Sequence, residues 1–171
     1  MFELKRISPE AIPRALAKAE RYRLLNEPEE AESICEDVLR IDPDNQQALV
    51  TLLLSLTDNF HSGHAGRLQQ ARGLLPRLKD PYEQAYYAGI ICERWAKAQH
   101  YANRRSPFVH NSLREAMSLY EKAEALSPPG NDDAVLRWNA CVRFIQSTDE
   151  LKSGGEDFGT ETGFRDDVPP R

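Results

Sequence analysis

Apolar residues recur along most of this chain with the period of an amphipathic helix. They stand three and four positions apart, for example at Ala31, Cys35 and Val38, and this spacing places them on one side of a helix. No stretch of useful length shows the two-residue period of a strand. Proline, glycine and helix-capping residues separate the periodic segments. We therefore expect seven helices, near residues 7–25, 28–41, 46–60, 65–78, 81–102, 107–127 and 131–147.

The boundaries between these segments carry residues typical of helix starts. Asp80 precedes Pro81 and is followed by Glu83, a combination that joins an N-cap carboxylate, proline in the first turn and a returning glutamate. Asn26 and Asp44 are likewise expected to cap the helices that follow them.

Two of the expected helices share an internal repeat. The segment AESICEDVLRIDP (residues 31–43) aligns without a gap with AMSLYEKAEALSP (residues 116–128). Alanine begins both segments, a small residue or valine follows seven positions later, and proline stands five positions beyond that. A small residue lets a paired helix approach closely, and the proline ends the helix. This pattern resembles the second helix of a tetratricopeptide repeat, a helix pair with a period of about 34 residues.

The resemblance extends over about 140 residues and is closest at residues 12–45. It implies an all-α solenoid of about three helix pairs, closed by a C-terminal capping helix. Residues 131–147 suit the cap, because Trp138 and Cys141 share one apolar stripe and Arg143 lies outside it. We assign residues 1–151 to this helical repeat domain. Residues 152–171 contain four glycines and two prolines, and we expect them to form a flexible acidic tail.

Charge and composition narrow the functional classes. The chain is 40% apolar and 29% charged, as globular domains are, and its net charge is −5. This balance argues against nucleic-acid binding, which needs a concentrated positive field. No segment approaches the apolar length of a membrane span. The N-terminus lacks an apolar export run, and the three cysteines stand in apolar helical stretches, so we expect core cysteines and a cytoplasmic protein.

The family resemblance also implies where a partner binds. In tetratricopeptide arrays, the first helix of each pair lines a concave groove that holds a peptide or helix of another protein. Among the tyrosines of the fifth expected helix, Tyr87 is the expected exposed anchor. The expected groove residues are Glu20, Arg23, Leu24, Thr51, Leu54, Asp58, Tyr87, Ile91, Arg94, Lys97 and Arg137.

Some members of the family grip a C-terminal carboxylate with asparagine and lysine at fixed groove positions. An amphipathic or extended apolar segment is a better candidate ligand here. The clamp is not expected, because the corresponding positions hold Leu16, Glu20, Val50 and Leu54.

The sequence thus predicts an adaptor or scaffold that binds a peptide or amphipathic helix of another protein, without a cofactor or metal and without catalysis. One alternative is a small secretion-type chaperone of the same family, which would be a dimer. A second alternative is an enzyme with an unrecognised site near His61 and His64, although no further metal ligands accompany these two histidines. The oligomeric state stays open.

Two further features have no assigned role. Arg104, Arg105 and Arg114 form a compact basic cluster that could meet an acidic partner or the acidic tail. Phe158 and Phe164, flanked by acids in the tail, could fold back into the groove and compete with a partner.

Overall fold

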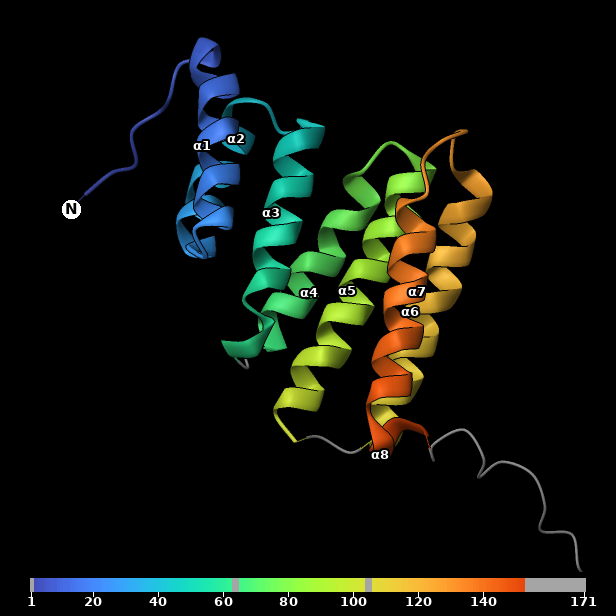
Figure 1. The fold of residues 1–171 in the computed structure, drawn as a ribbon. Coiled ribbons are helices and arrows are strands. Elements are labelled where there is room, and N and C mark those ends of the chain that lie inside the picture. Colours follow the sequence, from blue (N-terminus) through green and yellow to red (C-terminus); the bar gives the residue numbers. More distant parts are fainter. Residues whose placement is uncertain (1, 63–64, 104–105, 153–171) are drawn as a thin grey trace, which may run out of the picture.

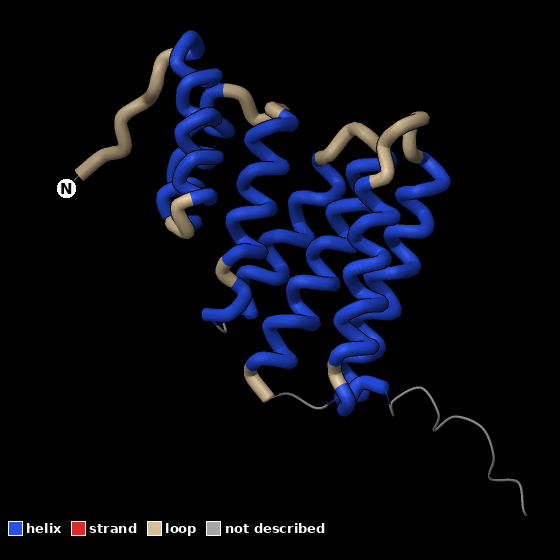
Figure 2. The backbone as a smooth tube through the Cα atoms, viewed as in Figure 1, coloured by secondary structure: helices blue, strands red, loops and turns tan. Residues whose placement is uncertain are grey.

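The computed structural model describes residues 2–62, 65–103 and 106–152 (Figure 1). Over these ranges the protein is all-α and contains no strand, as Figure 2 shows. The predicted fold class is confirmed to this extent. The main helices are α1 (Ile12–Leu24), α2 (Pro28–Ile41), α3 (Gln46–Asp58), α4 (Ala65–Leu74), α5 (Pro81–Tyr101), α6 (Ser106–Leu126) and α7 (Asp133–Ser147).

Short elements explain where the helices depart from the predicted bounds. Proline cannot donate a backbone hydrogen bond, so the chain before α1 forms a separate 3-10 turn, and Pro76 falls in another turn after α4. A four-residue helix after α7 was not predicted. These elements are η1 (Pro9–Ala11), η2 (Phe60–Ser62), η3 (Leu75–Arg77) and α8 (Asp149–Lys152).

The expected caps are confirmed at one of three positions. Asp80 caps α5, and its carboxylate accepts a hydrogen bond from the Tyr82 backbone N–H at 2.9 Å. The prediction for α3 is wrong by one residue, because Asn45 is the N-cap and accepts from the Ala48 N–H at 3.0 Å. The prediction for Asn26 is also wrong. Its φ of 60° is left-handed, a conformation that asparagine tolerates, and it follows the end of α1 instead of capping α2.

The helices form a repeating array in which each one packs against the next along the chain. The pairs α1–α2, α3–α4 and α5–α6 follow one another, and α2, α4 and α6 also contact the first helix of the following pair or the closing helix. The first helices contact one another as well, α1 with α3 and α3 with α5. Figure 1 shows the resulting two layers, with α1, α3, α5 and α7 in front of α2, α4 and α6. We call the outward side of the front layer the first-helix face.

Three groups of buried side chains form the core between the layers. A small group around Leu16 and Val38 holds the start of the array, a large one centres on α3, and another joins α5, α6 and α7. The alanines of the internal repeat are fully buried, as expected of small residues at helix contacts. The unpredicted helix α8 belongs to the last group, because Leu151 is fully buried there.

Candidate functional site

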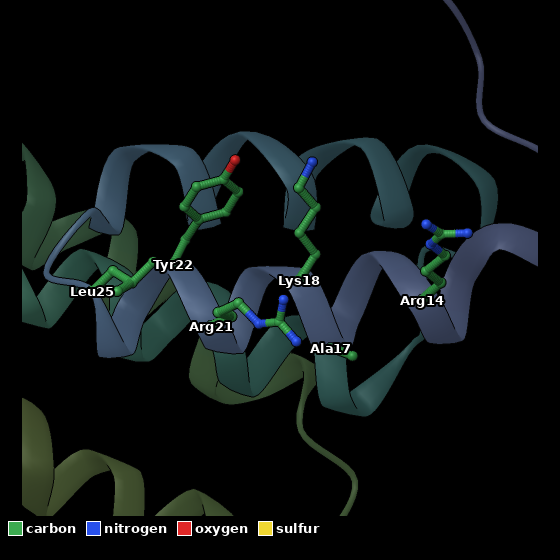
Figure 3. Close-up of a pocket in the computed structure, with 6 residues that line it drawn as sticks. All are labelled: Arg14, Ala17, Lys18, Arg21, Tyr22 and Leu25. Carbon is green, nitrogen blue, oxygen red and sulfur yellow. The ribbon is translucent and has the colours of Figure 1, made fainter.

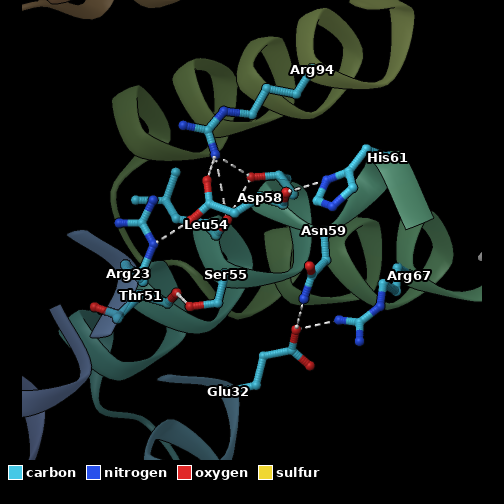
Figure 4. Close-up of polar contacts among 11 residues, drawn as sticks. Arg23, Glu32, Thr51, Leu54, Ser55, Asp58, Asn59, His61, Arg67 and Arg94 are labelled. Carbon is cyan, nitrogen blue, oxygen red and sulfur yellow. Dashed lines mark hydrogen bonds and ion pairs between the residues drawn. The ribbon is translucent and has the colours of Figure 1, made fainter. Parts of the chain in front are cut away.

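Two of the predicted groove residues, Arg23 and Arg94, meet at the carboxylate of a third, Asp58, on the first-helix face. The Arg23 Nε atom of α1 donates to Asp58 Oδ2 at 2.8 Å, and Arg94 of α5 pairs with the other oxygen, Oδ1. Arg94 also donates to the hydroxyl oxygen of Thr57 at 2.7 Å. Figure 4 shows the two guanidinium groups reaching Asp58 from different helices. We call Arg23, Asp58 and Arg94 the Asp58 cluster, and it joins α1, α3 and α5.

A second ionic cluster lies further along the array. Glu93 of α5 is fully buried, and its carboxylate pairs with Lys97 Nζ at 2.6 Å and with Arg137 Nη2 of α7 at 2.9 Å. The Tyr120 hydroxyl of α6 donates to the same carboxylate at 2.7 Å. Burial, together with the neighbouring Glu93 charge, raises the pKa of Tyr120, so the hydroxyl keeps the proton that it donates. We call Glu93, Lys97, Tyr120 and Arg137 the Glu93 cluster.

The two clusters together contain more cations than carboxylates. Four of the predicted residues are cations, whereas the clusters contain two carboxylates. The cationic side chains are 20–31% exposed, so each is held in place by an ion pair and still reaches solvent. This arrangement can accept carboxylates from a ligand without first having to order its own side chains.

Two residues predicted to line the groove are instead part of the core. Thr51 is 3% exposed and Ile91 is 1% exposed, so neither can contact a partner. The predictions for both are wrong for the same physical reason. Their helices, α3 and α5, have neighbours on several sides, and a mostly apolar helix in that position buries more than one face.

Tyr87 is half-buried and is not the exposed anchor that the sequence predicted. It packs against both larger core groups, as does Leu54, and burial raises the pKa of Tyr87 to about 12. The tyrosine therefore joins two parts of the core. At the edge of the face, Leu24 is 89% exposed, and Glu20 is exposed and accepts a hydrogen bond from Gln47 at 3.1 Å.

Glu93 is the central site residue that the sequence analysis missed. The sequence does contain a signal for Glu93. It is an acid in the interior of a helix, directly after the apolar residues Ile90–Cys92 and three positions before Ala96. Buried acids are rare unless they are paired. Its partners Tyr120 and Arg137 are 27 and 44 positions away along the chain, and no local pattern links residues so far apart.

The alternative site near the histidines gains no ligands in the described part of the chain. The His61 ring nitrogen Nδ1 lies 3.0 Å from the Asp58 carbonyl oxygen, a contact drawn in Figure 4. Within residues 2–62, 65–103 and 106–152, no group of three or more metal-ligating side chains gathers. His64 lies outside the described residues.

Other expectations fall partly or wholly outside the described residues. Arg114 is exposed on α6, but Arg104 and Arg105 are not described, and neither are the tail residues Phe158 and Phe164. The three cysteines are buried in the core, as predicted, and none of them forms a disulfide. No helix in the described ranges combines the length and apolarity needed to span a membrane.

Comparison of the chain with protein-family models, with curated proteins and with solved structures gave no match. The resemblance to tetratricopeptide repeats stays an expectation from the sequence.

Proposed function

We propose that this protein is an interaction module that holds a peptide segment or a helix of another protein on its first-helix face. One observation carries the proposal: ion-paired side chains, whose cations are 20–31% exposed, lie in two clusters that extend across α1, α3, α5 and α7. A helical array needs no such row for its packing. Buried or half-buried ion pairs contribute little net stability compared with apolar contacts, so a binding role is a reason for their presence.

The chemistry of the face defines the kind of segment that fits it. The excess of cations over carboxylates in the two clusters favours a segment with carboxylates, and Leu24 and Leu54 offer apolar contacts near the Asp58 cluster. An acidic segment with one or two apolar side chains satisfies both requirements. We propose an adaptor or scaffold role for the module, with a partner of this character.

The test compares two matched pairs of substitutions in affinity purification from a lysate of the source organism. The test variant is Arg94→Gln with Lys97→Gln. The control is Lys122→Gln with Arg143→Gln, which removes the same charges from exposed positions on α6 and α7. Asp58 keeps its pair with Arg23, and Glu93 keeps Arg137 and Tyr120, so the test variant is expected to fold; thermal unfolding followed by circular dichroism checks this.

We expect at least one protein that is retained by the wild type and by the control variant and is lost with the test variant. A set of captured proteins that is the same for both variants would contradict the proposal. So would the absence of any enriched protein.

A further inference from the structure

The outer side of α1 carries a second charged stripe, separate from the first-helix face. Arg14, Ala17, Lys18, Arg21, Tyr22 and Leu25 line an open hollow of about 540 Å³ along this helix, and we call them the outer stripe. Figure 3 shows Arg14, Lys18 and Tyr22 in a row along the helix, with their side chains pointing away from it and Arg21 beside them. The spacing of three and four positions is the one by which a helix presents a continuous side to a neighbour.

Among the described residues, the cations of the outer stripe have no acidic partner within the chain, unlike those of the first-helix face. Within the described residues, Arg14, Lys18 and Arg21 form no ion pair, whereas Arg23 and Arg94 share Asp58. Like charges three and four positions apart repel one another on a helix. They are grouped here although the chain as a whole carries a net charge of −5.

Apolar and aromatic groups accompany these charges. The Lys18 Nζ atom lies over the Tyr22 ring, 5.6 Å from its centroid. Leu25 is 60% exposed, and Ala17 is an exposed small residue in the middle of the stripe. A small residue lets another helix come close, while arginine and aromatic side chains are enriched where proteins bind one another.

The position of α1 in the array leaves this side available. The elements that pack extensively on α1 are η1, α2 and α3, and its buried residues Leu16 and Ala19 lie on the opposite side of the helix from the outer stripe. We infer that the outer stripe is a docking site for an acidic amphipathic helix of a partner protein. The apolar residues of the partner helix would face Ala17 and Leu25, and the carboxylates of that helix would pair with Arg14, Lys18 and Arg21.

Nucleic acid and anionic membranes are poorer ligands for the same stripe. Residues 26–60 contain nine acids and one base, and α2, directly beside α1, exposes Glu29, Glu30 and Glu36. An extended polyanion or a membrane plane would meet these carboxylates and be repelled. A single helix of about 14 residues matches the length of α1, about 20 Å, and does not need to reach α2.

The inference can be tested with a designed peptide and the full-length protein. The probe is a fluorescent amphipathic helix of about 14 residues, with leucines three and four positions apart and glutamates flanking them. Fluorescence anisotropy measures its affinity for the wild type and for the Arg14→Gln, Lys18→Gln, Arg21→Gln variant. The matched control is Arg114→Gln, Lys122→Gln, Arg143→Gln, which removes two arginines and one lysine from exposed positions elsewhere.

We expect the stripe variant to weaken binding about tenfold or more, equivalent to about 1.4 kcal/mol, with the control variant unchanged. An Ala17→Glu variant separates binding from folding: it places an acid among the cations without touching the core, so the protein stays folded and the affinity falls. Binding to the wild type should weaken as ionic strength rises.

Several results would overturn the inference. These are no binding of the acidic probe, equal binding by the wild type and the stripe variant, or equal binding of a probe in which lysines replace the glutamates. Preference for a short DNA duplex or for anionic vesicles would assign the stripe to a different ligand. Self-association lost in the stripe variant, measured by sedimentation, would assign it to a second copy.

The Arg94→Gln, Lys97→Gln variant keeps this experiment independent of the proposed function. It should retain the binding that the stripe variant loses, because both substitutions lie on the first-helix face and leave Arg14, Lys18 and Arg21 in place. Loss of binding in that variant alone would place the probe on the first-helix face and not on the outer stripe.

Discussion

The contact between Gly89 and Tyr120 makes the α5–α6 pair sensitive to a single methyl group. A Cβ atom added at Gly89 would lie 2.5 Å from Tyr120 Cε1 and 2.8 Å from Cδ1, well inside the 3.5–4.0 Å at which carbon atoms pack favourably. The ring has no free space, because Tyr120 is fully buried. Its hydroxyl is also fixed by the 2.7 Å hydrogen bond to Glu93. We predict that Gly89→Ala destabilises the protein.

The size of the loss in stability follows from one stabilising and two destabilising effects. Alanine in place of glycine in a helix stabilises it by about 0.5–1 kcal/mol. Overpacking of a close-packed core costs about 1–3 kcal/mol. Displacement of the ring also weakens a hydrogen bond to a charged group, which contributes about 1.5–3 kcal/mol. The free energy of unfolding should therefore fall by about 1.5–5.5 kcal/mol.

Urea unfolding followed by circular dichroism measures this change. Gly73→Ala is the matched control, because no atom lies within 4 Å of an added Cβ at that helical position, and it should raise stability by about 0.5–1 kcal/mol. In a Tyr120→Leu background the clash is removed, so Gly89→Ala should be neutral or slightly stabilising there.

A Gly89→Ala variant that matches or exceeds the wild type in stability would contradict the prediction. So would a cost of Gly89→Ala that is the same in the Tyr120→Leu background. The second result would show that the loss of stability comes from the backbone of α5 and not from the contact with the ring.

Four further predictions concern the core. The three buried thiols should react with a thiol reagent only as fast as the protein opens, because burial raises their pKa values to between about 11 and about 12. Burial raises the pKa of Cys35 to about 12 from 9.0 and that of Tyr87 to about 12 from 10.0. The folded state therefore holds these protons more tightly than the unfolded state, so stability should be full below about pH 9 and decline up to about pH 12, measured as the urea midpoint against pH. Tyr120→Phe should lower the free energy of unfolding by about 1.5–3 kcal/mol, because it removes a donor from buried Glu93; an unchanged urea midpoint would contradict this. Leu151→Ala should cost about 2–5 kcal/mol in the same assay, and a cost near zero would show that α8 is not part of the core.

The sequence predicts the helices of this protein well because each boundary has a local cause. The fifth expected helix, 81–102, and the observed α5, Pro81–Tyr101, differ by one residue at one end, since Asp80 and Pro81 define the start chemically. Where two prolines stand close together, as before and within the start of α1, the same local rules leave the start ambiguous, and the structure contains a separate turn there.

The faces of the helices are harder to predict than their ends. Thr51 and Ile91 belong to helices with several neighbours, and the number of neighbours is a property of the whole array that periodicity does not contain. Gly89 shows a similar limit. It is the residue of α5 against which the Tyr120 ring of α6 packs, and no local pattern links the two because 31 positions separate them in the sequence.

The charge clusters depend on contacts between distant segments. Arg23, Asp58 and Arg94 were all predicted to lie on the binding face, but nothing in the sequence indicates that they neutralise one another. The pairing changes their interpretation, because a cation already held by a carboxylate is ordered before a ligand binds, whereas an unpaired cation is not. The same comparison distinguishes Arg14, Lys18 and Arg21 of α1, which form no ion pair with any described residue.

The extent of helix packing differs along this array. The α5–α6 hairpin forms the most extensive helix–helix contact among the described elements, whereas α1, at the other end of the array, packs less extensively on α2 and α3. In chains whose repeats touch only their neighbours, transient opening begins at the weaker end. Fraying should therefore start at α1 and α2, and hydrogen exchange there should be fastest. A partner helix bound to the outer stripe would stabilise that end of the array. Hydrogen exchange in α1 and α2 would then slow, while exchange in α5 and α6 would stay unchanged.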